Sequence, residues 1–295
     1  MSIRILFPGP LSTIQDAGRF GYLKSGIGTS GVMDREAYEI ANRLLQNTAG
    51  EAVIEATLLG PALFFDSDCV CCITGADMTP TLDGQSVPMY QPFLIRAGQT
   101  LSLSAAVNGC RSYLSFAGGI DVPLVLGSRS TNLKCRLGGY QGRALQKDDV
   151  LSLGPATADV SSLLQNKAPK PFFSSPVTVR VIEGPQAEYF TKRGKQTFYG
   201  HPYTVSPESD RMGYRLEGPA VESENGVDIV SDGIAFGAVQ IPPSGKPIIL
   251  LSDRQTTGGY AKIATVISKD IPSLAQLKPG DQVLFEKTDL SKIQS

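Results

Sequence analysis

Residues 246–267 read KPIILLSDRQTTGGYAKIATVI. The run KPIILL is apolar enough for a buried strand, and KIATVI reads as a second strand. A plain hairpin needs only two to five turn-forming residues between its strands. The connection here also carries Asp253, Arg254, Tyr260 and Lys262 around the tetrapeptide TTGG, so it either decorates a surface or builds a site.

The alternation of apolar and polar residues recurs along most of the chain. In QTLSLSAA, Leu101 and Leu103 face one way while Ser102 and Ser104 face the other. Similar runs are RSYLSFAGG, VTVRVIEG and DQVLFEK, and the 31 glycines and 20 prolines suit many tight turns. The sequence therefore predicts a mainly β protein with few short helices.

The clearest helical pattern is DREAYEIANRLLQN, at residues 34–47. Asp34 is a good N-cap residue, because its carboxylate can accept a hydrogen bond from a free backbone N–H in the first turn. Apolar side chains then recur at helical spacing, at Ala37, Ile40, Ala41, Leu44 and Leu45. A second, shorter helix is predicted around GPQAEYFT, at residues 184–191.

The two halves of the chain echo one another. LQKDDVLSLG closes the first half in the same style as LAQLKPGDQVLFEK near the end, and each half contains a GPA tripeptide. A segment rich in Ala, Ser, Pro and Lys separates them at residues 156–176. Because 295 residues suit two ordinary domains, we predict related β-barrels at 1–165 and 176–295, joined by a linker at 166–175.

Composition argues against several classes of protein. The 27 basic residues nearly balance the 28 acidic ones, so neither nucleic acid nor a membrane surface is an expected partner. No segment reaches membrane-spanning length, and the apolar stretch at the N-terminus is too short for a signal peptide. His201 is the single histidine, which rules out sites that need two imidazoles from this chain.

The five cysteines are an odd number without CxxC spacing, so they fit neither a disulfide framework nor a zinc site. Three of them lie in CVCCITG, which reads as a buried strand where cysteine acts as a small apolar side chain. We therefore expect a cytoplasmic protein without a bound metal.

Polar side chains concentrate among glycines in four stretches of the chain. Charged side chains beside Gly-rich turns at strand ends are how rigid scaffolds present reactive groups. Arg211 and Arg254 are the expected anion holders, because a guanidinium grips a carboxylate or phosphate with two parallel hydrogen bonds. The four stretches lie at residues 14–34, 206–219, 231–245 and 252–266.

The other charged residues of these stretches have both a functional and a structural interpretation. Lys262 is suited to stabilise a developing oxyanion or, if desolvated, to act as a base, and Asp210 and Asp253 to orient an arginine or accept a proton. The alternative is that the Asp–Arg pairs cap turns, Asp34 caps a helix and Tyr260 is a packed ring. No GxGxxG fingerprint follows a predicted strand and no P-loop occurs, so a nucleotide would need another means of binding.

Four motifs together resemble the family of 5-oxoprolinase C subunits, also known as KipA or allophanate hydrolase subunit two and often labelled biotin-dependent carboxyltransferase. The resemblance covers nearly the whole chain. The motifs are IQDAGRFGYLKSGIGTSGVMDREAYEIANRLLQN, TLLGPALFF, SDRMGYRLEGP and PIILLSDRQTTGGYAKIATV. The resemblance implies two cyclophilin-like β-barrels with the active groove where they meet.

The resemblance also implies partners and an activity. A KipI-like B subunit of 5-oxoprolinase and a further A subunit are the expected partners, and the assembled enzyme would open 5-oxo-L-proline to L-glutamate at the expense of ATP, held at the level of the complex. One alternative is a biotin-dependent carboxyltransferase of the urea amidolyase type. Its biotin would sit on another chain, because no methionine here is followed by lysine. The other is a regulatory antagonist that binds a KipI-like kinase inhibitor.

These expectations single out two sets of residues around a small-molecule substrate, and we expect the four polar stretches to converge on one groove. The catalytic candidates are Arg254, Lys262, Asp210 and Arg211. The substrate-binding candidates are Thr256, Thr257, Gly258, Gly259, Tyr260, Gln240, Asp16, Arg19, Ser30 and Asp34.

Overall fold

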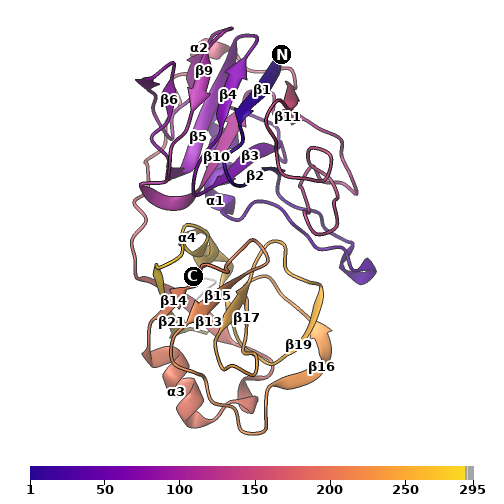
Figure 1. The fold of residues 1–295 in the computed structure, drawn as a ribbon, viewed down its shortest axis with the longest axis vertical. Helices are drawn as coiled ribbons and strands as arrows, with labels where there is room; N and C mark the ends of the chain where they lie inside the picture. The colour runs from indigo at the N-terminus through magenta and orange to yellow at the C-terminus, as the bar shows by residue number, and fades with distance from the viewer. Residues whose placement is uncertain (290, 292–295) are drawn as a thin grey trace. The chain divides into compact units, whose positions relative to one another are not determined.

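The computed structural model describes residues 1–289 and 291 and divides the chain into two compact units. Unit 1 contains Met1–Phe20 and Ser30–Phe173, and unit 2 contains Gly21–Thr29 and the chain from Ser174 onward. Most regular structure in both units is β-strand, which confirms the predicted fold class (Figure 1). Every helix in the described part of the chain is too short or too polar to traverse a lipid bilayer.

The strands of unit 1 form two antiparallel sheets. The larger sheet has the order β11-β12-β1-β4-β9-β6-β7, and the smaller has the order β2-β3-β10-β5-β8. The strands of the larger sheet are β11 (Ile120–Asp121), β12 (Val150–Leu153), β1 (Ser2–Phe7), β4 (Ala62–Phe65), β9 (Thr100–Ser102), β6 (Thr81–Leu82) and β7 (Gln85–Ser86). Those of the smaller are β2 (Ser12–Gln15), β3 (Val53–Thr57), β10 (Asn108–Phe116), β5 (Cys69–Asp77) and β8 (Phe93–Ile95).

Both sheets of unit 1 face one apolar core, as the alternation in the sequence predicts. Leu101 and Leu103 are buried in it, and Phe65 of the larger sheet meets Phe116 of the smaller with ring centroids 5.9 Å apart. The cysteine-rich strand β5 is buried on both faces. Its Cys71 lies in this core, and burial raises the pKa of the neighbouring Cys72 thiol to about 12, so these cysteines serve as apolar side chains.

The predicted helix of unit 1 is present but shorter. Helix α1 spans Arg35–Leu44 and packs on β5 and β10, while Asp34 caps it by accepting a hydrogen bond from the Ala37 backbone N–H at 2.9 Å. The helix stops before residue 47 because Gln46 adopts a left-handed backbone with φ +52°. A four-residue helix, α2 (Val160–Leu163), lies later in unit 1.

Removing the α1 cap tests this local reading. Asp34→Ala is expected to lower the free energy of unfolding by about 1 kcal/mol, because the first helical turn loses an acceptor. Asp34→Ser retains a capping oxygen and is expected to lose much less. Urea denaturation followed by circular dichroism measures the effect, with Asp121→Ala at an exposed strand position as the control. An equal loss in the alanine and serine variants would contradict a capping role.

The strands of unit 2 close into a barrel, which confirms the barrel prediction there. The ring has the order β13-β20-β17-β18-β15-β14-β21, and the parallel pair β13–β21 closes it. The strands are β13 (Val177–Glu183), β20 (Lys262–Val266), β17 (Ala238–Gln240), β18 (Ile248–Leu250), β15 (Gly213–Glu217), β14 (Tyr203–Val205) and β21 (Gln282–Lys287). Two short helices, η3 (Ser268–Asp270) and α4 (Ile271–Ala275), follow β20.

The second predicted helix is displaced along the chain. Only a short 3-10 helix, η2 (Ala187–Tyr189), forms within 184–191. Helix α3 (Lys192–Gly200) begins immediately afterwards, because Thr191 caps it by accepting a hydrogen bond from the Gly194 N–H. Its Phe198 is fully buried and stacks on Phe285 of β21 at 4.3 Å, so α3 is held against the barrel by aromatic packing.

The 246–267 stretch is not a hairpin with a long turn. Strands β18 and β20 both pair with β17, which lies between them in the barrel. Within TTGG, which the two flanking apolar runs predict as a turn, Thr257–Gly259 instead belong to strand β19 (Thr257–Tyr260). This strand pairs with β16 (Asp228–Gly233) in a separate two-stranded ribbon. The turn prediction was wrong because the pairing partner, β16, is distant in sequence.

Two connecting segments have unexpected attachments. The predicted linker, 166–175, contains no helix or strand, but Asn166 donates to the Leu44 carbonyl and Phe173 exchanges hydrogen bonds with Asn108, all within unit 1. Residues 21–29 belong to unit 2 although both flanks belong to unit 1. The chain therefore passes from one unit to the other three times.

Candidate functional site

Arg254 lies just before the ribbon of unit 2 and is 8% exposed. Its Nε donates to the Ile234 carbonyl at 3.1 Å, and its Nη1 donates to Thr29 Oγ1 at 3.2 Å and to the Leu251 carbonyl at 3.4 Å. The guanidinium also lies over the ring of Phe236, 5.4 Å from its centroid. These contacts fix the plane of the guanidinium.

The positive charge of Arg254 is not neutralised within the part of the chain that the structure describes. No carboxylate there forms an ion pair with it, and all three of its hydrogen bonds use neutral oxygens on Nε and Nη1. Burial lowers the pKa of the Arg254 guanidinium, because the charged form is desolvated. Among the described residues, Nη2 donates to none, so its two N–H groups remain for an anionic ligand.

Lys262 begins strand β20 and is 3% exposed. Its Nζ contacts Asp232 Oδ2 at 2.9 Å, while the Asp232 side chain is 54% exposed. The hydrogen bond from Lys262 lowers the pKa of the Asp232 carboxyl below its ordinary value. Because the pKa is lowered, the pair persists above the ordinary aspartate range and is lost only as pH falls through the lowered pKa.

One short segment connects the two bases. Asp232 at the end of β16 holds Lys262, and the Ile234 carbonyl two residues later accepts from Arg254. The hydrogen bonding between β16 and β19 extends one residue beyond both strands, because the Ile234 N–H donates to the Thr256 carbonyl at 3.1 Å. Alternate residues of an extended chain lie about 7 Å apart, so the anchors of the two cations are close neighbours.

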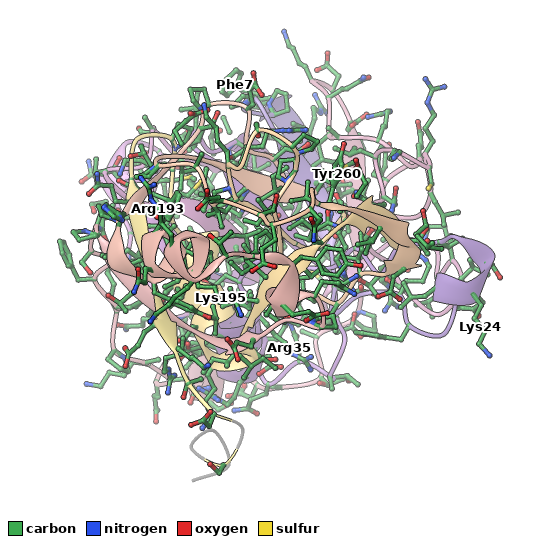
Figure 2. The ribbon with its side chains drawn as sticks, turned by 90° about the horizontal axis from the view of Figure 1, so that it is seen from below. Phe7, Lys24, Arg35, Arg193, Lys195 and Tyr260 are labelled. Carbon is green, nitrogen blue, oxygen red and sulfur yellow. The ribbon has the colours of Figure 1, made fainter. Side chains whose placement is uncertain are left out.

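The ribbon residues mostly support this arrangement. Gln240 is buried and donates through Nε2 to the Tyr260 carbonyl at 3.3 Å. A Cβ on Gly258 would lie 2.7 Å from Ile234 Cδ1 and 2.9 Å from Gln240 Nε2, so this glycine makes room for packing rather than for a ligand. Tyr260, on β19, is 38% exposed (Figure 2). Two further candidates, Thr257 and Gly259, lie on the same strand.

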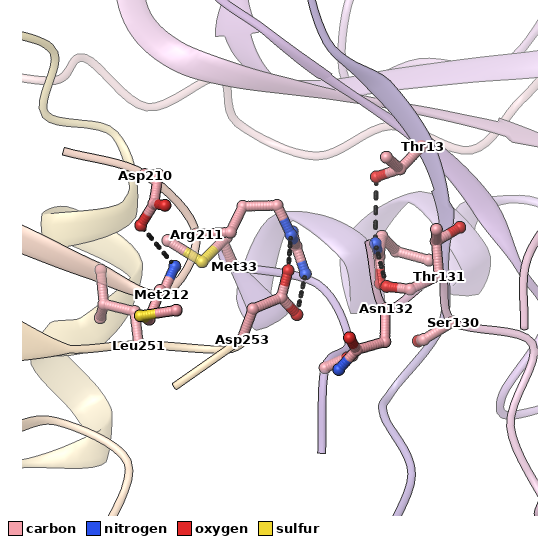
Figure 3. Close-up of polar contacts among 12 residues, drawn as sticks. Thr13, Met33, Ser130, Thr131, Asn132, Asp210, Arg211, Met212, Leu251 and Asp253 are labelled. Atoms are coloured by element: carbon pink, nitrogen blue, oxygen red, sulfur yellow. Dashed lines mark hydrogen bonds and ion pairs between the residues drawn. The ribbon is translucent and has the colours of Figure 1, made fainter. Parts of the chain in front are cut away.

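Arg211 and Asp210 have partners of their own in unit 2. Arg211 Nε donates to Asp253 Oδ2 at 2.9 Å, and both side chains are largely buried (Figure 3). The two Asp–Arg sequence pairs therefore combine, with the arginine of one bound to the aspartate of the other. Asp210 accepts from the backbone N–H groups of Met212 and Gly213, which is a turn-capping role.

Four substrate-binding candidates lie in unit 1, where each has internal partners. The Asp16 carboxylate accepts hydrogen bonds from the hydroxyls of Ser128 and Ser130 and from the backbone N–H groups of Gly18 and Arg129. Such a fully hydrogen-bonded carboxylate organises the loop that supplies its donors. The other three are Arg19, which donates to the carbonyls of Val125 and Ser130, Ser30, which accepts from Asn132, and the helix cap Asp34.

The candidates thus divide into two groups. Arg254, Lys262 and Gln240 come together in unit 2, next to the ribbon that carries the TTGG residues. The candidates of residues 16–34 belong to unit 1. Convergence of all four polar stretches on one groove stays a prediction.

Sequence reasoning did not single out three residues of this site: Thr29, Asp232 and Phe236. All three lie inside polar stretches that it did select. An acid in the SDG tripeptide at the end of a strand was a usable signal for Asp232. Nothing in the sequence indicates that Thr29 reaches Arg254, since 225 positions separate them.

The model of the family described as "Carboxyltransferase domain, subdomain A and B" matches residues 25–287. The chain is 37% identical to the C subunit of 5-oxoprolinase from Escherichia coli strain K12 over 98% of its length and 92% of that protein. It is 39% identical to the corresponding C subunit of 5-oxoprolinase from Haemophilus influenzae, covering 95% of this chain and 89% of that one.

The chain belongs to the family of 5-oxoprolinase C subunits. The resemblance inferred from the four motifs is therefore confirmed. This chain shares its fold with the crystal structure of the Kluyveromyces lactis urea carboxylase, which superposes on it with a TM-score of 0.92 at 30% sequence identity. The match covers 99% of this chain and 28% of that much longer one.

Proposed function

We propose that this chain is the C subunit of an ATP-dependent 5-oxoprolinase, which opens 5-oxo-L-proline to L-glutamate together with its A and B subunits. The observation that carries the proposal is the buried guanidinium of Arg254, whose charge has no carboxylate partner in the described part of the chain. 5-Oxoproline offers both a carboxylate and an amide carbonyl, which are acceptors for the N–H groups that remain on Nη2.

The two bases have complementary roles in this proposal. Arg254 binds the anionic or planar group through Nη2, while Lys262 provides a compact positive charge close by. The lactam oxygen accepts the γ-phosphoryl group of ATP, and water then adds to the activated carbon. The ring C–N bond breaks with its electron pair going to nitrogen, and hydrolysis of the resulting acyl phosphate gives L-glutamate and phosphate. Fixed cations stabilise the anionic phosphoryl oxygens in these steps. Asp232 keeps the Lys262 ammonium in place.

We place ATP at the level of the complex rather than on this chain alone. The sequence has no P-loop, and no GxGxxG motif follows a strand. Within residues 1–289 and 291, no group of three His, Cys, Asp or Glu side chains is arranged to hold a metal ion. The site in unit 2 offers two cations and an arrangement that suits the substrate better than a metal–nucleotide complex.

Reconstitution tests the proposal. This chain alone is expected to show almost no 5-oxoproline-dependent ATP hydrolysis, and the three purified subunits together are expected to form glutamate. Leaving this chain out of the mixture should abolish glutamate formation. Robust turnover by the single chain, or full turnover by the A and B subunits without it, would contradict the proposal.

A second candidate activity is carboxyl transfer of the urea amidolyase type, with biotin carried by another chain. The structural match to urea carboxylase favours it. Transfer of a carboxyl group from biotin to an amide nitrogen also needs anion binding and oxyanion stabilisation. The same purified chain, given urea and a carboxylated biotin carrier, distinguishes the two: carboxylation of urea without action on 5-oxoproline would favour this candidate.

Normal growth on 5-oxoproline after deletion of the gene would instead favour the regulatory antagonist.

A further inference from the structure

Residues 21–29, the excursion, are a short segment of unit 2 that is inserted between two parts of unit 1 and has hydrogen bonds within itself. The N–H groups of Ser25 and Ile27 donate to the Tyr22 carbonyl, and Gly26 donates to Leu23 around the 3-10 helix η1 (Leu23–Ser25). Lys24 extends from this helix (Figure 2). Among the residues that the structure describes, one hydrogen bond joins this segment to the rest of unit 2: Arg254 Nη1 donates to Thr29 Oγ1.

Thr29 is the one side chain among the hydrogen-bond acceptors of Arg254 in the described structure. The other two acceptors are the carbonyls of Ile234 and Leu251, which belong to the barrel unit's own backbone. The Leu251 bond is the longest of the three at 3.4 Å, so Thr29, at 3.2 Å, is the better acceptor for Nη1. Of the two acceptors of Nη1, the Thr29 hydroxyl therefore opposes rotation of the guanidinium within its plane more strongly than the Leu251 carbonyl does.

The direction of Nη2 depends on this contact. The guanidinium is planar, so holding Nε and Nη1 fixes where the two Nη2 N–H groups point. The ring of Phe236, whose centroid lies 5.4 Å from Arg254 Cζ, opposes tilt of the plane but offers no hydrogen-bond acceptor that would oppose rotation within the plane. We propose that Thr29 is a positioning residue, which orients Arg254 so that Nη2 is presented to the anionic group of the substrate.

This inference rests on the proposed function, and it predicts a specific dependence on an acceptor at residue 29. Thr29→Val keeps the shape of the side chain but removes the acceptor. Because hydrogen bonds to charged groups are among the stronger ones, kcat/KM of the reconstituted three-subunit enzyme is expected to fall about tenfold to a hundredfold. Thr29→Ser restores the oxygen and is expected to recover most of the activity.

A double-mutant cycle separates positioning from a general structural role. In the Arg254→Lys background no guanidinium remains to be oriented, so Thr29→Val is expected to cause almost no further loss. The exposed Thr178→Val, on β13, is the matched control and is expected to leave kcat/KM unchanged. Thermal melting of all variants should agree with wild type within a few degrees.

Two results would overturn the inference. One is wild-type kcat/KM in Thr29→Val, and the other is a loss of equal size in the wild-type and Arg254→Lys backgrounds. Both require an active wild-type complex. If wild type itself shows no 5-oxoproline turnover, the proposed function fails first, and this outcome is distinguishable from failure of the Thr29 inference.

Discussion

Arg254→Lys is expected to lower turnover of the reconstituted complex by roughly a hundredfold to a thousandfold, the usual cost of losing one stabilising donor at a reacting centre. Lysine keeps the positive charge but lacks the planar guanidinium. In wild type, Nε and Nη1 donate to Ile234 and Thr29, and Nη2 stays available for the substrate. Steady-state assays of glutamate formation, at saturating ATP, measure the effect.

Thermal stability of a second variant at the same position provides the control. A buried charge without a partner is costly to a fold, so Arg254→Met is expected to melt at the wild-type temperature or above it while losing activity. Arg193→Lys, at an exposed position on α3, should change neither property. Wild-type turnover in Arg254→Lys, with normal assembly onto the B subunit of 5-oxoprolinase, would show that the residue has only a structural role.

Lys262→Met is expected to reduce turnover by about a hundredfold and to leave folding nearly intact. Methionine retains most of the apolar stem in a site that is 3% exposed. The abandoned carboxylate of Asp232 is more than half exposed, so water replaces the lost ammonium at little cost. Turnover and thermal melting on the same preparations separate loss of chemistry from loss of fold.

Asp232→Asn distinguishes how Lys262 acts. The asparagine keeps an acceptor for the Lys262 ammonium but removes the neighbouring negative charge, so the variant is expected to retain more activity than Lys262→Met. If Lys262→Met and Asp232→Asn both turn over 5-oxoproline like wild type, Lys262 is a buried structural cation and not part of the reacting centre.

Local patterns predicted much of the fold because they act over a few residues. The alternation at Leu101–Leu103 and the Asp34 cap both appear in the structure as expected. Closure of the barrel depends instead on pairing Val177–Glu183 with Gln282–Lys287. These two strands are adjacent in the barrel but far apart in the sequence. The sequence does not predict helix α3, because KRGKQTFYG contains two glycines and little apolar periodicity.

The site was predictable in its residue types but not in its partners. Charged residues among glycines pointed to Arg254 and Lys262, and the structure places both beside one short segment. Arg211 has the same sequence context as Arg254, yet its guanidinium is bound to Asp253. Which arginine is paired depends on contacts between distant parts of the chain, and a single sequence does not reveal them.

The excursion at residues 21–29 also has a consequence for the order of events during synthesis. Thr29 leaves the ribosome 225 residues before Arg254 does. At about 5 to 20 residues per second, the segment waits roughly 10 to 45 s for its hydrogen-bond partner to exist. Translation therefore sets the earliest moment at which the anion-binding arginine can be oriented, and a gene split after codon 173 would encode its two hydrogen-bonded residues on separate polypeptides.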